Sequence, residues 1–185
     1  MKIGLVGESP HDTKSVSNLL KRIYPGFSFI DMIPDIHGSQ LDQMQPTKAR
    51  LRLEFQFEKP DLVIFIRDLD ALKKDFAQYR KRVSYFQEFR TVVNKKAIFL
   101  LFIWEIEALI LCDLKSFNIM YNCDCSNEID PHEVEAPKEV LKKLNHKYSQ
   151  VHNPEIFNKL DVEKIKTTSK YFSDFLKKVD NFFQN

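Results

Sequence analysis

Apolar residues form short continuous runs in the first half of the chain, and helical spacing follows most of them. The runs at 3–7, 27–33, 61–67 and 97–103 are typical of strands buried in a parallel sheet. Amphipathic helical spacing follows in 10–23, where Ser9 and Pro10 form a helix start, and again in 75–93. This alternation predicts an α/β fold in which helices flank a parallel sheet.

The segment 39–57 has two competing patterns. Its composition is helical, but Pro46 is expected to break a helix. Apolar residues also alternate at Leu51, Leu53, Phe55 and Phe57, as they do in a strand. Both interpretations stay open from the sequence.

Beyond residue 107 the apolar spacing becomes helical. It predicts helices over 108–121, 137–148 and 161–183, with a loop at 122–136. No Ser/Gly-rich linker separates these helices from the preceding part. We therefore predict an α/β core over 1–121 and a helical C-terminal extension over 122–185 that packs on the core.

Composition excludes several common classes of protein. Among 185 residues there are only 4 glycines, too few for a phosphate-binding or dinucleotide-binding glycine loop. HExxH, CxxC and GxSxG motifs are absent, and Cys123, Cys125 and His132 do not complete four zinc ligands. The three cysteines do not suggest a disulfide framework.

No stretch of the sequence predicts contact with a membrane. The longest apolar run ends at Glu105 and is far shorter than the roughly 20 residues that cross a bilayer. The amino-terminal residues contain no h-region of a signal peptide. We expect a cytoplasmic protein.

Carboxylates follow three of the predicted strands. Glu8 follows the first strand, Asp68 and Asp70 the third, and Glu105 and Glu107 the fourth. The carboxyl ends of parallel strands meet at one edge of a sheet, so we expect these groups to converge. Converging carboxylates require a hard cation, for which Mg²⁺ or Mn²⁺ is the natural choice. The competing interpretation is that they are solvated turn residues or helix caps.

The spacing of the two aspartates adds an expectation about direction. Asp68 and Asp70 would point to the same side if the strand continued through Leu69, which would then face the core.

These acidic positions resemble a known domain. The stretch Gly7-Glu-Ser-Pro-His-Asp12, followed later by Asp68-Leu-Asp70, resembles the Toprim domain of topoisomerases, primases and related nucleases. Further along, Glu107-Ala-Leu-Ile-Leu-Cys-Asp113 and the Pro-Lys-Glu-Val-Leu run at 137–141 resemble an uncharacterised family of small bacterial Toprim-like proteins with Glu-x-Trp-Leu-x-x-Asp and Pro-Lys-x-x-Leu motifs. The resemblance spans nearly the whole chain. It departs at Ser9, where Toprim domains usually have glycine, and at Leu109, where the family commonly has tryptophan.

The resemblance implies a Toprim-like, Rossmann-type sheet that carries a metal-dependent catalytic site. It assigns Asp68 and Asp70 as metal ligands and Glu8 as a general acid/base that can share the metal. Glu107 is a further catalytic acid by this resemblance, and Glu105 is a weaker candidate. A divalent ion polarises a phosphoryl oxygen and lowers the pKa of bound water.

Basic residues gather directly after the Asp68–Asp70 pair. Between 73 and 96, eight lysines and arginines stand against Asp75 and Glu88, a local charge of plus six. We expect part of this segment, together with His11 at a helix start, to contact nucleic-acid phosphates. The residues assigned to this role are His11, Lys73, Lys74, Arg80, Lys81 and Arg82. A solvated helix face is the alternative, and Arg67 suits an ion pair as well as a phosphate contact.

Together these features predict a metal-dependent phosphodiester hydrolase, a nuclease acting on DNA or RNA. Toprim-like nucleases often work beside ATPases, including in bacterial defence against phage, so the resemblance also implies an ATPase partner. The alternative is a non-catalytic Toprim-like module that binds nucleic acid or a partner. Nucleotidyl or phosphoryl transfer would use the same metals, but no nucleotide pocket is recognisable in the sequence.

Overall fold

A four-stranded parallel sheet forms the centre of the molecule, in a computed structural model that describes residues 1–72, 74–126 and 130–184. The strands are β1 (Lys2–Val6), β2 (Ser28–Asp31), β3 (Leu62–Asp68) and β4 (Ala97–Phe102), in the order β2-β1-β3-β4. All three strand pairings are parallel. The predicted α/β class with a helical C-terminal region is confirmed.

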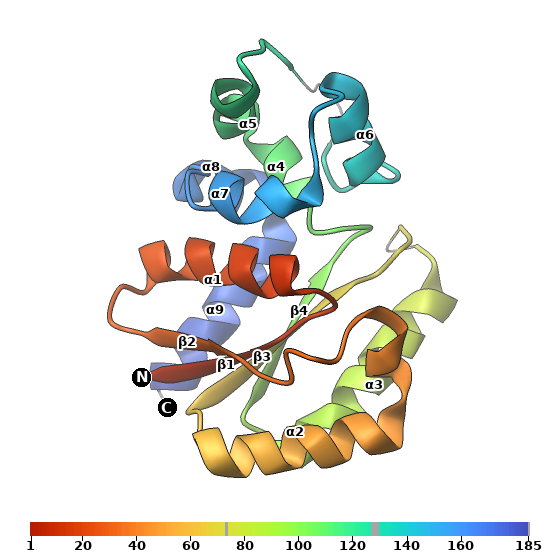
Figure 1. The fold of residues 1–185 in the computed structure, drawn as a ribbon, viewed down its shortest axis with the longest axis vertical. Coiled ribbons are helices and arrows are strands. Elements are labelled where there is room, and N and C mark those ends of the chain that lie inside the picture. The colour runs from red at the N-terminus through yellow and green to blue at the C-terminus, as the bar shows by residue number, and fades with distance from the viewer. Residues whose placement is uncertain (73, 127–129, 185) are drawn as a thin grey trace.

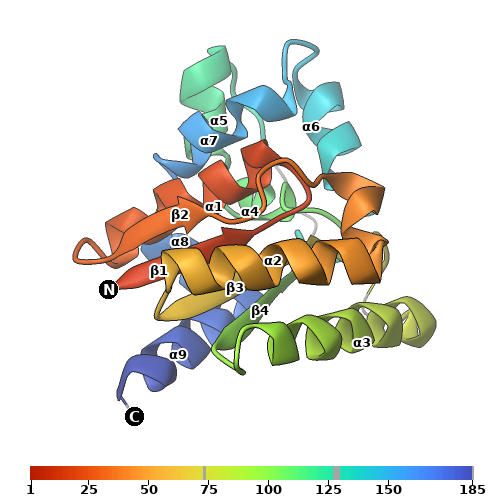
Figure 2. The same cartoon turned by 60° about the horizontal axis from the view of Figure 1, so that its bottom comes forward.

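Helices cover both faces of the sheet (Figures 1 and 2). One face packs against α1 (Pro10–Ile23) and α9 (Lys170–Gln184). The other packs against α2 (Met44–Glu58) and α3 (Phe76–Val92), with a short 3₁₀ helix, η1 (Gly38–Asp42), before α2. Successive side chains of β3 point to opposite faces of the sheet, as the pleat of a strand requires. Ile64 packs in the core under α1 and α9, and Phe65 packs in the core under α2 and α3. The uniformly apolar strands therefore reflect burial on both faces.

Local signals fix the start of α1. Ser9 has extended backbone and its side chain accepts a hydrogen bond from the Asp12 amide, while Pro10 stands at the first helical position. This turn places Glu8 and Asp12 on either side of the helix start, at the carboxyl end of β1.

The segment 39–57 is largely helical. Pro46 lies in the first turn of α2, where a backbone N–H has no intrahelical partner, so it does not break the helix. Leu53 and Phe57 point into solvent on α2, 65% and 82% exposed.

The helices beyond residue 107 are shorter than predicted. The expected helix over 108–121 is wrong, because the chain breaks at Asp113 into α4 (Ala108–Cys112) and α5 (Leu114–Tyr121). The expected helix over 161–183 breaks at Ser169 into α8 (Val162–Thr168) and α9, and the Ser169 hydroxyl accepts from the Phe172 amide. The helix expected over 137–148 ends early, as α6 (Pro137–Leu144). The sequence analysis also missed η2 (Gln150–His152) and α7 (Asn153–Phe157).

The C-terminal helices contact the α/β part through α1 as well as through the sheet. The Asn18 amide donates to the Pro154 carbonyl at 2.7 Å, and the Arg22 guanidinium donates to the Leu160 carbonyl at 2.6 Å. Helix α9 packs along β4, and its Phe172 and Phe175 join the same core as the strands. A domain boundary at 121 stays a prediction.

Within the residues described, no helix combines the length and the apolar character that crossing a membrane requires.

Candidate functional site

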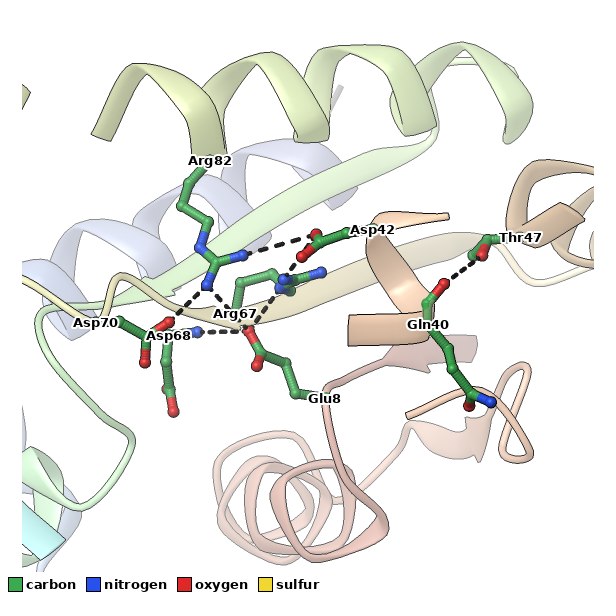
Figure 3. A network of polar contacts seen from close by, with 8 residues as sticks. All are labelled: Glu8, Gln40, Asp42, Thr47, Arg67, Asp68, Asp70 and Arg82. Carbon is green, nitrogen blue, oxygen red and sulfur yellow. Dashed lines mark hydrogen bonds and ion pairs between the residues drawn. The ribbon is translucent and has the colours of Figure 1, made fainter. Parts of the chain in front are cut away.

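The carboxyl ends of β1 and β3 bring three of the predicted acids together (Figure 3). Glu8 lies two residues beyond β1, Asp68 is the last residue of β3, and Asp70 follows two residues later. The Asp68 backbone amide lies 3.3 Å from the Glu8 carboxylate, to which it donates. Glu8, Asp68 and Asp70 therefore converge at one edge of the sheet, as the sequence predicts.

Two buried arginines hold two of these acids, Glu8 and Asp70. The Arg67 Nε lies 2.6 Å from Glu8 Oε1, and its Nη2 lies 3.1 Å from Asp42 Oδ1. The Arg82 Nη2 lies 2.6 Å from Asp70 Oδ2 and 3.8 Å from Glu8 Oε1. Asp42 comes from η1, and sequence analysis missed it because nothing in the local pattern marks it. The arginines provide positive charge inside the acidic edge.

The sequence left Arg67 open as an ion-pair partner or a phosphate contact, and in the structure it forms the ion pair. It is 2% exposed, and its guanidinium lies 4.5 Å from the centre of the Tyr85 ring. Such a buried, stacked guanidinium orients Glu8.

The residues predicted to bind nucleic acid divide into two sets. Lys74, Arg80 and Lys81 are exposed, as that role requires. Arg82 is 5% exposed and forms an ion pair with Asp70. Its position therefore does not match the exposed phosphate-binding role predicted for it. His11 is half-buried in the first turn of α1. Lys73 lies outside the described residues.

Asp68 sits in the most negative environment of the site. Burial raises the pKa of its carboxyl group well above the usual value, and the charges of Asp12, Glu107, Glu8 and Asp70 raise it further. Among the described residues its carboxylate has no hydrogen-bond or ion-pair partner. Asp68 therefore lacks the compensation that the arginines give to Glu8 and Asp70.

Asp12 belongs to the same cluster, although the sequence analysis placed it only in the helix start and in the stretch that resembles Toprim domains and did not assign it to the site. Burial raises the pKa of its carboxyl group to about 7, with smaller contributions from Glu107 and Glu8, while a hydrogen bond with the Ser9 side chain opposes them. The signal that could have identified Asp12 was its position in the first turn after β1, which lies over the carboxyl end of the sheet.

Glu107 joins the cluster from the start of α4. It is 3% exposed, and its Oε1 accepts hydrogen bonds from the Tyr148 hydroxyl at 3.1 Å and the Asn153 amide at 3.0 Å. Both donors come from the C-terminal helical region. These hydrogen bonds fix Glu107 beside the sheet edge and link the two parts of the chain.

The two sequence stretches that resemble the small bacterial Toprim-like family contact each other through α4 and α6, and Glu105, just before the first stretch, also contacts the second. Glu105 Oε2 accepts from the backbone amide of Lys138, the lysine of the Pro-Lys run, at 3.0 Å. Burial raises the pKa of the Glu105 carboxyl group. Asp113, the last residue of the other stretch, is 2% exposed and lies away from this contact, bound to Lys164 and to the Asp161 amide. Asp113 has a structural role, whereas Glu105 and Glu107 border the acidic edge.

The backbone beyond β3 is not regular. The strand ends at Asp68, and Asp70 has a left-handed conformation with φ 56°, so strand alternation does not set its direction. Leu69 is buried, as expected. The Asp70 amide donates to the carbonyl of Trp104, which is also left-handed at φ 59°. Such conformations cost about 1 to 3 kcal/mol each and persist where the surrounding structure fixes them. In this turn the Asp70 side chain lies against Arg82.

The acids offer a donor set suited to a hard divalent cation, since all ligands are carboxylate oxygens and Asp68 has no partner among the described residues. As the side chains are placed, the described residues contain no group of three or more His, Cys, Asp and Glu side chains that could hold a metal ion. The donor chemistry fits magnesium or manganese, and an ion held by Asp70 would displace Arg82 from that carboxylate or share it.

Comparisons with known proteins identify one family. The sequence model of the family described as Domain of unknown function (DUF4276) matches residues 8–180. The match covers most of the chain, so the chain belongs to this family. Searches of curated proteins and of solved structures found no match.

Proposed function

We propose that this member of the DUF4276 family is a metal-dependent phosphodiester hydrolase, a nuclease that acts on DNA or RNA with Mg²⁺ or Mn²⁺. The observation that carries the proposal is the convergence of Glu8, Asp68 and Asp70 at the carboxyl edge of the sheet, where the Asp68 carboxylate has no partner among the described residues. A negative site of this kind suits a cation that neutralises it. The resemblance to Toprim domains supports the same assignment.

In this proposal Asp68 and Asp70 hold the divalent ion, and Glu8 lies at its edge and acts as the general acid/base. The ion supplies charge stabilisation to a phosphoryl oxygen and lowers the pKa of a bound water. Arg67 orients Glu8 through the 2.6 Å ion pair. The pKa of Asp12, about 7, suits a group that gains or loses a proton near neutral pH, which is the property of an effective general acid or base. Glu107, held by Tyr148 and Asn153, adds negative charge next to Asp68.

A second function is favoured by the arginine contacts. Arg67 and Arg82 already compensate Glu8 and Asp70, so two of the three acids have a counter-charge without a metal. A site of this kind suits a non-catalytic module that binds nucleic acid or works beside an ATPase. For either function we propose a cytoplasmic location. A role in defence against phage rests on the Toprim resemblance.

Cleavage assays distinguish the two functions. Purified protein is incubated with labelled single-stranded and double-stranded DNA and RNA, with Mg²⁺, Mn²⁺ or EDTA. We expect cleavage that requires the metal and falls at least about 100-fold in Asp68→Asn and Asp70→Asn, while Glu8→Gln keeps metal binding but loses about 10² to 10⁴-fold in turnover. The matched control is Glu163→Gln, a carboxylate on α8 whose side chain is 80% exposed.

Two outcomes would decide against the nuclease. Wild-type protein that binds Mn²⁺ in calorimetry but cleaves no substrate, even with a candidate ATPase present, would favour the binding module. Cleavage that survives all three substitutions would refute the catalytic assignment.

A further inference from the structure

Helix α2 carries apolar side chains on two sides, and one of them faces solvent. Leu51 and Phe55 are buried in the core, whereas Leu53 and Phe57 lie on the opposite side of the helix, 65% and 82% exposed. Figure 2 shows α2 in front of the sheet, at the surface of the molecule. Single exposed apolar side chains are ordinary, but a continuous apolar stripe marks an interaction surface.

The exposed stripe is small at one end and bulky at the other. Helical residues are spaced by about 100°, which places Pro46, Ala49, Leu53 and Phe57 within an arc of about 80° on α2. All four are exposed, and we call them the outer stripe. Two such helices packed antiparallel set the bulky half of each against the small half of the other. A parallel pair would set Phe57 against its own copy and leave a gap between the two Ala49 side chains.

One flank of the outer stripe carries a pair of opposite charges. Arg50 and Glu54 lie one turn apart on that flank. In an antiparallel pair related by a two-fold axis, each flank faces the same flank of the other copy. An axis level with residue 52 therefore sets Arg50 of each copy opposite Glu54 of the other, because both residues are equally far from the axis.

The same register also fits the apolar side chains. It sets Phe57 level with residue 47 of the second copy, in the space between Pro46 and Ala49. It brings the two Leu53 side chains within about 3 Å of the same level, at 1.5 Å per residue. Shape and charge therefore select one register independently, which favours a second copy of this chain over an unrelated partner.

The charged side chains of this flank are available for the contact. Arg50 is 56% exposed and lies 3.8 Å from Asp35 Oδ2 and 4.0 Å from Glu54 Oε2 of its own chain. Glu54 is 18% exposed and uses Oε2 for the Ile33 amide, while its Oε1 has no partner among the residues described. Arg52 lies on the other flank, where the register sets it opposite its own copy. This pair opposes association, by a repulsion that salt screens.

We propose that two copies of this chain form a symmetric dimer in which their α2 helices pack antiparallel through the outer stripe. The contact uses one helix from each copy, so it belongs to the small interfaces, below about 1,200 Å² in total. We therefore expect a weak dimer, with a dissociation constant of about 1 to 100 μM. The proposal is independent of the nuclease, because the stripe lies on α2 and the acids lie beyond β1 and β3.

The oligomeric state in solution tests the outer stripe. Sedimentation equilibrium of the full chain is measured over about 1 to 500 μM, where the wild type should dimerise. Leu53→Glu/Phe57→Glu should weaken association at least about 30-fold, the effect of losing one hot-spot residue. The matched control is Ile119→Glu/Val151→Glu, at two apolar side chains that are 68% and 52% exposed in the C-terminal region, and it should dimerise like the wild type.

Charge exchange tests the register. Arg50→Glu and Glu54→Arg each set like charges against one another at both flank contacts, so each variant alone should dimerise about 5-fold or more weakly. An equimolar mixture of the two variants restores opposite charges at both contacts and should form a heterodimer with the affinity of the wild type. Arg52→Gln removes the opposing pair and should tighten the dimer by about 2-fold at low salt.

Three results would decide against the proposal. A wild type that remains monomeric at about 500 μM would overturn it. A dimer that the stripe variant leaves unchanged would place the interface elsewhere. Single charge variants that weaken the dimer without recovery on mixing would refute the antiparallel register. If Glu54→Arg does not fold, because it loses the acceptor of the Ile33 amide, the stripe variant and Arg50→Glu decide the case.

Discussion

Asp12 allows a quantitative test of the electrostatics of the acidic edge. Its side chain lies in the first turn of α1, and burial, Glu107 and Glu8 together raise the pKa of its carboxyl group from 3.8 to about 7. Asp12→Asn keeps the size of the side chain and removes the charge. The backbone cap is preserved, because Ser9 accepts its hydrogen bond from the main-chain amide of residue 12.

The sign of the effect follows from proton linkage. Below pH 3.8 the carboxyl group is protonated in both states, so its titration has no effect on stability. Between 3.8 and about 7 the unfolded chain is ionised while the folded protein keeps the proton, so stability falls as pH rises. Above about pH 7 the loss is complete, and at about 1.36 kcal/mol per pH unit it amounts to at most about 4 kcal/mol.

The expected difference is somewhat smaller. Asp12→Asn loses a favourable interaction with the helix N-terminus, about 0.3 to 1 kcal/mol. We therefore expect the variant to exceed the wild type in unfolding free energy by about 3 kcal/mol at about pH 8, and by nearly nothing at about pH 4. For a chain of this size each kcal/mol shifts the melting temperature by about 2 to 4 °C.

Urea unfolding between about pH 4 and pH 8, with EDTA present, measures this difference. The control is Asp35→Asn, whose side chain is 85% exposed and which should change stability by less than about 0.5 kcal/mol at every pH. A constant offset between Asp12→Asn and wild type across the pH range would refute the titration argument. A variant less stable than wild type at the high end of the range would refute the claim that burial, with the neighbouring acids, disfavours the Asp12 charge.

Two further substitutions test contacts that hold the site. Arg82→Gln leaves Asp70 and Glu8 with less compensation, so urea unfolding should show a decrease in stability of about 1 to 3 kcal/mol, and combining it with Asp70→Asn should recover part of that decrease. Asp113→Ala removes the acceptor for Lys164 and for the Asp161 amide, so stability should fall by about 2 to 4 kcal/mol and hydrogen exchange in α8 should accelerate, with slow exchange in α8 refuting its role.

The elements that sequence reasoning identified are those with local signals. Continuous apolar runs marked all four strands, and Ser9-Pro10 marked the start of α1. The helix break at Asp113 was missed because its cause is tertiary, whereas the break at Ser169 has a local cap, in which the Ser169 hydroxyl accepts from the Phe172 amide, that the sequence analysis did not consider. Asp113 turns inward to bind groups 48 and 51 residues away, and no periodicity near residue 113 reports such contacts. Pro46 left the segment 39–57 open for a different reason. Proline breaks a helix in its interior but is tolerated in its first turn, and the sequence did not show where α2 begins.

The candidate site also combines features that local sequence predicts with features that depend on tertiary packing. The convergence of Glu8, Asp68 and Asp70 follows from strand ends in a parallel sheet, which the apolar runs predict. The pairing of Arg67 with Glu8 spans 59 residues, and the part played by Asp42 depends on the path of η1. The sequence could indicate that Arg82 was one of a basic group, but only the packing of α3 separates it from the exposed Arg80 and Lys81.

The arginine contacts compete with any metal that this site could bind. A divalent ion at Asp68 and Asp70 must replace Arg82 at Asp70 or share that carboxylate with it. Separating a buried guanidinium from its carboxylate is costly unless the released group finds a new partner, and a guanidinium is an effective bidentate ligand for phosphate. Metal and phosphate would therefore bind more strongly together than separately, because the phosphate compensates the arginine that the metal displaces. Metal affinity measured without a nucleic acid would then underestimate the affinity of the loaded site.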